Sequence, residues 1–292
     1  MALSMGQQPN IRRCILGALQ DLPALPDVVN KILTEADRET ATANQIEALA
    51  RNDQALVAKI LRVVNSAYYG LPGQVSSLSQ AIVILGLHQV RNLVLSISAL
   101  SMVKARTPRQ REILKAFWLH GMATASGAQA IARQQHLDSR DVELAYIGGM
   151  LHDVGKLFLF CNFTDTYQEV VYFAEAQGLP MNEAELSLLG MDHQEVGQEL
   201  AIHWRYPEPL TLLISRHEGP FAGAPTPALY AVHAADRLAS SLPHGQQPGA
   251  PPLMDPAVEA WLAWNEDEPE SLKLKMEDAI RHASELFGMI AP

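Results

Sequence analysis

The clearest chemical signal in the chain is a histidine followed directly by an aspartate, His152 and Asp153, within the string GGMLHDVGKL. Neighbouring side chains on a helix point about 100° apart, so both can reach one cation that sits against the helix surface. Lys156 follows three residues after Asp153 and therefore shares this face. Its ammonium group is placed to contact a phosphate oxygen beside the metal. The spacing predicts a metal site that acts on a phosphate group, with Asp153 and Lys156 as catalytic residues.

Four further residues have side chains that commonly bind metals. They are a histidine in the preceding long helix, one at the start of a helix, one at the end of a helix, and an aspartate inside a helical run: His120, His193, His217 and Asp236. Neutral imidazoles combined with carboxylates suit iron, zinc or manganese. A site with four or more such ligands could hold two metals, which activate a bridging water for attack on phosphorus. The set predicts a centre with one or two divalent cations.

Each of these residues also has a structural explanation. His120 could be a hydrogen-bonded core histidine, His193 an exposed residue of a first helical turn, and Asp236 an ordinary solvated residue. A histidine in the last turn of a helix, such as His217, is stabilised by the helix dipole alone. The combination favours metal binding, because buried ionisable groups without partners are costly. Both interpretations remain open at this point.

The composition is that of a soluble globular protein, with 48% apolar and 18% charged residues among 292. Two cysteines, Cys14 and Cys161, are too few for a disulfide scaffold or a thiolate zinc site, and they favour a reducing compartment. The first residues lack the pattern of a secretory signal. The most apolar stretch, 93–103, is too short to span a bilayer. We therefore expect a cytoplasmic protein without membrane insertion.

The apolar residues repeat with the spacing of amphipathic helices through nearly the whole chain, and no convincing alternation of period two occurs in the sequence. Thr42 with Gln45 and Asp192 with Glu195 have the spacing of helix capping boxes. Residues 138–160 fit one helix that contains three glycines. The pattern predicts an all-α fold, an irregular helical bundle of two lobes.

A polar stretch that contains a proline, 104–110, is the best internal boundary. It divides the chain into a helical lobe, residues 1–106, and a helical core with a C-terminal extension, residues 107–292. The net charge of −10 is uneven across this boundary, with 10 Lys and Arg against 7 Asp and Glu before it and 12 against 25 after it. The basic residues of the first part are scattered, which favours solvated helix faces over a nucleic-acid footprint.

Several segments together resemble the HDOD family, the HD-related output domain of bacterial signalling. They are LPALPDVVNKIL, ALVAKILRVVNSAYYGLPGQVSSLSQAIVILGLHQVRNLVLSISAL, FWLHGMATASGAQAIA and GMLHDVGKLFLF, within a match over about residues 22–217. The resemblance implies an all-helical fold, with an N-terminal lobe packed on an HD-type core. It also implies a bacterial, cytosolic context and partners among signalling proteins of two-component or cyclic-dinucleotide pathways. HDOD domains are generally regarded as non-catalytic or of undefined activity.

The chain is also similar to the hydrolases related to this family. The HD phosphohydrolase series of a histidine, a His-Asp pair and a later aspartate resembles His120, His152, Asp153 and Asp236. HD-GYP cyclic-di-GMP phosphodiesterases add two histidines and a lysine, which resemble His193, His217 and Lys156. Two departures count against this activity: Glu218 stands where HD-GYP proteins carry another histidine, and the Gly-Tyr-Pro signature is not found.

Two functions follow as hypotheses. The first is a signalling module that acts mainly through protein–protein contact, with a bound metal in the HD-like site. The second is a metal-dependent phosphohydrolase that acts on a nucleotide or cyclic dinucleotide, in which Lys156 stabilises phosphoryl charge. In either case the expected cofactor is one or two ions of iron, manganese or zinc. Nucleic-acid binding by the N-terminal lobe is a weaker hypothesis, because the lobe lacks a clear recognition helix and a basic stripe.

Overall fold

The computed structural model is helical, and the residues that it describes include no strand. The described residues are 8–36, 38, 40–51, 53–65, 69, 71, 73–102, 107–221, 226–242, 249, 253–265 and 267–290. The prediction of an all-α fold is confirmed.

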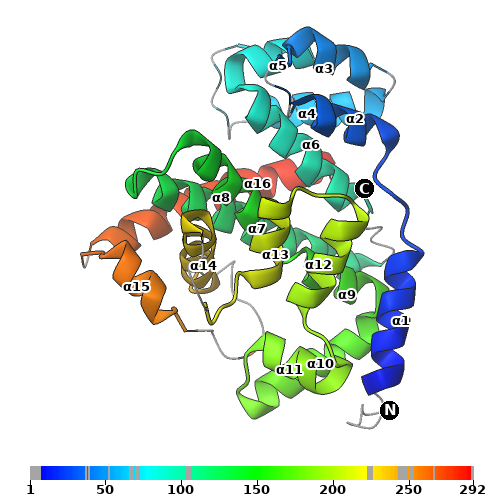
Figure 1. The fold of residues 1–292 in the computed structure, drawn as a ribbon, viewed down its shortest axis with the longest axis vertical. Helices are drawn as coiled ribbons and strands as arrows, with labels where there is room; N and C mark the ends of the chain where they lie inside the picture. Colours follow the sequence, from blue (N-terminus) through cyan, green and yellow to red (C-terminus); the bar gives the residue numbers. More distant parts are fainter. Residues whose placement is uncertain are drawn as a thin grey trace. The chain divides into compact units, whose positions relative to one another are not determined.

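The helices are numbered in chain order in Figure 1. Their bounds are α1 Gln8–Gln20, α2 Asp27–Ala36, α3 Ala43–Ala50, α4 Gln54–Val64, α5 Leu78–Leu85, α6 Leu87–Met102, α7 Pro108–Gln134, α8 Ser139–Leu151, α9 Val154–Asn162, α10 Thr164–Gln177, α11 Met181–Leu189, α12 His193–His203, α13 Glu208–Arg216, α14 Pro227–Ser240, α15 Pro256–Leu262 and α16 Glu268–Ile290.

The helices form two compact units, which we call the core unit and the small unit. The core unit comprises Met1–Leu22 and Ala105–Ile280, and the small unit comprises Pro23–Lys104 and Arg281–Pro292. Helix α1 thus belongs to the core unit although it precedes the small unit in the chain. The division into residues 1–106 and 107–292 stays a prediction about domain organisation.

The small unit contains α2–α6 and is built from amphipathic helices. In α2 the buried residues Val29, Ile32, Leu33 and Ala36 recur at the spacing of one helical face. The predicted capping box at the start of α3 is present, with the Thr42 side chain accepting a hydrogen bond from the backbone N–H of Gln45. Local signals in the sequence therefore set both the faces and the ends of these helices.

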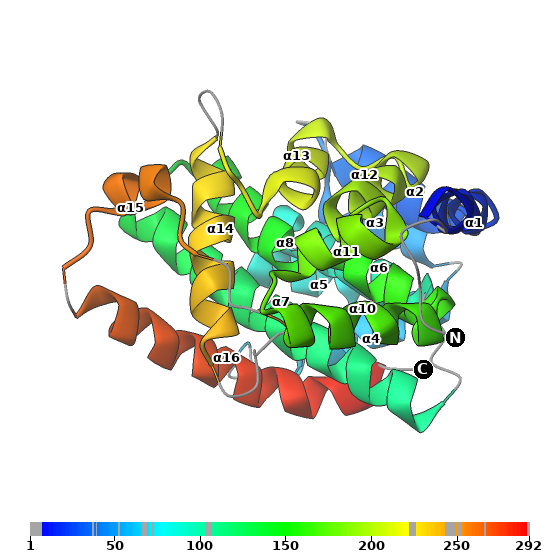
Figure 2. The ribbon, with the colours of Figure 1, turned by 90° about the horizontal axis from the view of Figure 1, so that it is seen from below.

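The centre of the core unit is the long helix α7, against which α8 and α14 pack (Figure 2). Helix α7 begins after the cap residue Thr107, with Pro108 in its first turn. The contact with α8 is close, because a Cβ atom on Gly149 would lie 2.8 Å from the backbone of Ala125. Small residues at this crossing bring α8 and α7 near enough for their side chains to share a site.

The prediction of one helix over residues 138–160 is wrong. Helix α8 ends at Leu151 and α9 begins at Val154, with His152 and Asp153 in the break. The break redirects α9 onto α12, where Gly155 lies against the backbone of His193 so closely that any side chain would clash. The apolar stretch Ser139–Asn162 is long enough to cross a membrane, but 78% of its most apolar part is buried in the protein. That burial is typical of a core helix in a soluble protein.

The N-terminus of α12 has the second predicted capping box, formed by Asp192 and Glu195. Asp192 is buried, whereas the equivalent Thr42 of α3 is exposed. Asp192→Ala should therefore lower the free energy of unfolding by about 2 kcal/mol, and Thr42→Ala by about 0.5 kcal/mol. Urea unfolding of the two variants checks this order. Equal losses would contradict a buried cap at α12.

Candidate metal centre

The structure brings all the predicted ligand residues together in the core unit. They come from α7, the break between α8 and α9, the start of α12, the end of α13, and α14: His120, His152, Asp153, His193, His217 and Asp236. All six side chains are buried, with exposed fractions of 4% or less. The explanations of His193 and Asp236 as solvated surface residues therefore do not hold.

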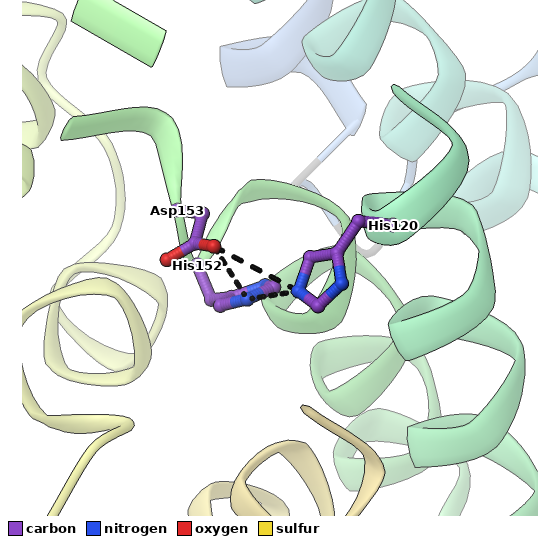
Figure 3. Close-up of side chains that lie close together, drawn as sticks. All are labelled: His120, His152 and Asp153. Atoms are coloured by element: carbon purple, nitrogen blue, oxygen red, sulfur yellow. Dashed lines mark hydrogen bonds and ion pairs between the residues drawn. The ribbon is translucent and has the colours of Figure 1, made fainter. Parts of the chain in front are cut away.

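The first cluster joins His120, His152 and Asp153 (Figure 3). The Nε2 atoms of His120 and His152 lie 3.2 Å apart. Asp153 Oδ2 lies 3.3 Å from His152 Nε2 and 3.7 Å from His120 Nε2. Asp236 adds a second carboxylate, with Oδ1 lying 3.1 Å from His120 Nε2. The donor atoms are two imidazole nitrogens and two carboxylate oxygens.

The second cluster joins Asp153, His193 and His217. The Nε2 atoms of the two histidines lie 3.2 Å apart, and Asp153 Oδ1 lies 3.6 Å from His193 Nε2 and 3.4 Å from His217 Nε2. Glu218 brings a further carboxylate oxygen, Oε1, to 3.4 Å from His193 Nε2. The two carboxylate oxygens of Asp153 therefore face different clusters, as in a ligand that bridges two cations.

The hydrogen bonds of the imidazole rings fit a metal at the second cluster. His217 Nδ1 lies 3.0 Å from the carbonyl oxygen of Ile214, and His193 Nδ1 lies 2.6 Å from Glu185 Oε2. Both Nδ1 atoms must donate here, so in the neutral rings both Nε2 atoms carry lone pairs. Two lone pairs that face each other at 3.2 Å need a proton or a cation between them. This arrangement is the usual one for histidines that bind metals.

The charges around the clusters also favour a cation. Lys156 Nζ lies 2.9 Å from Asp153 Oδ1, and Arg237 donates to Asp236 Oδ2 at 3.0 Å and lies 3.4 Å from Glu218 Oε2. Four carboxylates, those of Asp153, Glu185, Glu218 and Asp236, outnumber these two cationic side chains. Excess buried negative charge is costly unless positive charge is bound.

The pKa values of the histidines reflect this excess. Burial alone lowers the pKa of His152, but the carboxylates of Asp153 and Asp236 outweigh burial and raise it to about 10. In the same way burial lowers the pKa of His193, and Glu185 outweighs it to give a pKa of about 10. Burial dominates at His217 and lowers its pKa. One histidine facing each side of Asp153 therefore holds its proton more tightly than a free imidazole does.

The sequence patterns do not single out Glu185 and Arg237, which contact the predicted ligands. Glu185 comes eight residues before His193, a separation that gives no motif, and its contact with the site arises only from packing of α11 on α12. One signal was available: Glu185 interrupts the apolar stripe of α11, where Met181, Ala184 and Leu188 are buried. A charged residue on a buried face indicates a polar partner inside the fold.

Comparison with known proteins identifies the fold and the family. The profile of the HDOD domain matches residues 22–220, which is more than half of the chain. The chain belongs to the HDOD domain family. An HDOD domain protein from Geobacter sulfurreducens has the same fold, with a TM-score of 0.74 and 20% identity over 98% of this chain and 99% of that chain.

Other proteins with similar sequence or structure have varied descriptions. A protein of Shewanella amazonensis described as a candidate phosphohydrolase has a similar structure, with a TM-score of 0.71 and 22% identity. The match covers 95% of this chain and 98% of the Shewanella chain. An uncharacterised protein of Treponema pallidum is 26% identical to this protein over 72% of this chain. The chain spans only 40% of the length of that relative. At these identities the solved structures show a shared fold, and the chemistry must be argued from the site.

Proposed function

We propose that the core unit is a metal-dependent phosphohydrolase whose two clusters hold a pair of divalent cations. The observation that carries the proposal is the orientation of Asp153, whose Oδ2 lies 3.3 Å from His152 Nε2 while its Oδ1 lies 3.4 Å from His217 Nε2. His120, His152 and Asp236 would hold one cation together with Asp153. His193, His217 and Glu218 would hold the second, also together with Asp153. Bound divalent cations would supply Lewis acidity and would activate water for attack on phosphorus.

The donor set limits the identity of the cations. Each cluster offers two imidazole nitrogens and two carboxylate oxygens, a mixture that suits iron, manganese or zinc. Glu218 supplies an oxygen where HD-GYP enzymes carry a histidine, so the second cluster keeps a full set of ligands in spite of that departure. We therefore interpret Glu218 as a substitute ligand.

Two cationic side chains are placed to act on the substrate and on the ligands. Lys156 holds Asp153 in position and keeps 14% of its side chain exposed, more than any of the predicted ligands. Its ammonium group is therefore the cationic group best placed to meet phosphoryl charge that arrives from outside. Arg237 joins Asp236 to Glu218 and so fixes one carboxylate of each cluster. The substrate class that fits this chemistry is a phosphate ester, and we propose a nucleotide or cyclic dinucleotide.

The test is hydrolysis by the purified full-length chain. Wild-type protein loaded with Mn²⁺, Fe²⁺ or Zn²⁺ is incubated with a panel of cyclic dinucleotides, nucleoside phosphates and aryl phosphate esters. We expect turnover of at least one ester, its loss after treatment with a chelator, and its return when the metal is restored. Lys156→Met should lower the turnover per bound metal ion, with bound metal measured by elemental analysis, because the ammonium group that meets phosphoryl charge is lost. A metal-loaded protein that hydrolyses none of these esters would refute the proposed activity.

A second candidate function is docking of a signalling protein on the small unit, and it rests on a different observation. Helix α5 exposes two large apolar side chains, Val83 with 78% and Ile84 with 46% of its surface accessible. Large contiguous apolar patches mark interaction sites, and these two neighbouring side chains would contribute to such a patch. Affinity capture compares the wild type with Val83→Asp. A partner that is retained by the wild type and lost by the variant supports docking, whereas identical capture by both proteins contradicts it.

A further inference from the structure

Glu185 is a buried carboxylate that contacts the candidate metal centre without facing a cation position. It lies on α11, is fully buried, and its side chain reaches the first residue of α12. Its Oε2 lies 2.6 Å from His193 Nδ1 and accepts a hydrogen bond from the backbone N–H of His193 at 2.8 Å. One oxygen therefore fixes both the ring of His193 and the helix turn that carries it.

The other oxygen of the carboxylate is fixed from a third helix. The hydroxyl of Tyr167, on α10, donates a hydrogen bond to Glu185 Oε1. Tyr167 is itself buried, and its ring packs edge-on against Phe160 with centroids 5.6 Å apart. With both oxygens engaged, the carboxylate cannot rotate away from the imidazole. These hydrogen bonds link Tyr167 through Glu185 to His193.

These hydrogen bonds distinguish His193 from His152 and His217. His152 and His217 orient their rings by Nδ1 contacts with neutral carbonyl oxygens three residues earlier, those of Gly149 and Ile214. His193 instead donates to a charged carboxylate that belongs to another helix. A carboxylate partner makes the imidazole more basic and holds Nε2 toward the cation, and such partners typically strengthen metal binding.

We propose that Glu185, anchored by Tyr167, is a positioning residue that sets the metal affinity of the second cluster through His193. The proposal rests on the metal binding in the proposed function and extends it to residues outside the ligand set. The hydrogen bonds of the Glu185 carboxylate run to His193 and Tyr167, so the larger loss of affinity is expected at the second cluster.

The test is titration of the metal-free, full-length protein with Co²⁺, followed by visible absorption and by elemental analysis of bound cobalt. Wild-type protein should bind two Co²⁺ ions. Glu185→Gln keeps the size of the side chain but removes its charge, and it should weaken one of the two sites by about 10- to 100-fold. Tyr167→Phe should weaken the same site by a smaller factor. Glu183→Gln is the matched control, because Glu183 is exposed on the same helix.

A double variant assigns the affected site. In a His217→Ala background the second cluster has already lost a ligand, so adding Glu185→Gln should leave the affinity of the remaining site unchanged. Thermal unfolding in the presence of a chelator shows whether each variant folds without metal. Glu185→Gln or Tyr167→Phe protein that folds and binds both Co²⁺ ions like the wild type would overturn the proposal, as would equal weakening of both sites. Wild-type protein that binds two Co²⁺ ions without hydrolysing any ester would refute the hydrolase activity alone.

Discussion

Asp153→Asn should remove most of the bound metal and almost all phosphoester hydrolysis. Asp153 directs one oxygen to each cluster, with Oδ2 near His152 and Oδ1 near His193 and His217, so the substitution weakens both sites at once. Changes to residues that merely orient ligands typically cost 10- to 100-fold in metal affinity, so loss of a shared ligand should cost more than about 100-fold. Elemental analysis after dialysis and the rate with the best ester measure the two effects.

The control for this variant is the same substitution at an exposed aspartate of the core unit. Asp165 lies in the first turn of α10 and is exposed. Asp165→Asn should retain the metal content and the rate of the wild type. If Asp153→Asn kept two cations per chain, Asp153 would not be the bridging ligand.

Gly155→Ala should disrupt the centre through the backbone, although it changes no ligand. A Cβ atom on Gly155 would overlap the carbonyl oxygen of His193 and would lie 2.8 Å from the backbone nitrogen of Gly197. Neither obstacle is the flexible end of a side chain, so α9 and α12 must separate. We expect a loss of about 3 kcal/mol in the free energy of unfolding. Because Asp153 precedes α9 and His193 begins α12, metal content should fall as well.

Gly17→Ala tests whether this effect is specific to the crossing of α9 and α12. Gly17 lies inside α1, and a Cβ atom there would meet nothing within 4 Å. Because alanine favours helices more than glycine does, this variant should gain up to about 1 kcal/mol. Chemical unfolding of both variants provides the comparison. A Gly155→Ala protein as stable as the wild type would contradict the backbone contact.

Much of the fold follows from local patterns in the sequence. The helical spacing of apolar residues predicts an all-α protein, and the caps at Thr42 and Asp192 begin helices where expected. Residue type predicts His120 and Asp236 as ligands, and the structure places both beside His152. Few residue types bind metals, and those residues are seldom buried without a partner. Residue type alone therefore reduces the number of candidate ligands.

The features that the sequence did not reveal depend on contacts between distant segments. No proline and no long polar stretch marks the break between α8 and α9 in the sequence. The break allows Gly155 to pack against α12, and this contact depends on a distant segment of the chain. The carboxylate of Glu185 similarly acquires a role only through its contact with His193. Local spacing predicts which face of a helix is buried but not which helix covers it.

The most direct test of the metal centre is anomalous diffraction from crystals of the protein grown with Mn²⁺. Two anomalous peaks should lie on opposite sides of the Asp153 carboxylate, one bounded by His120 and His152 and the other by His193 and His217. Crystals grown with saturating Mn²⁺ that showed no anomalous peak at these histidines would contradict the account. A single anomalous peak that Asp153 does not contact would contradict it as well.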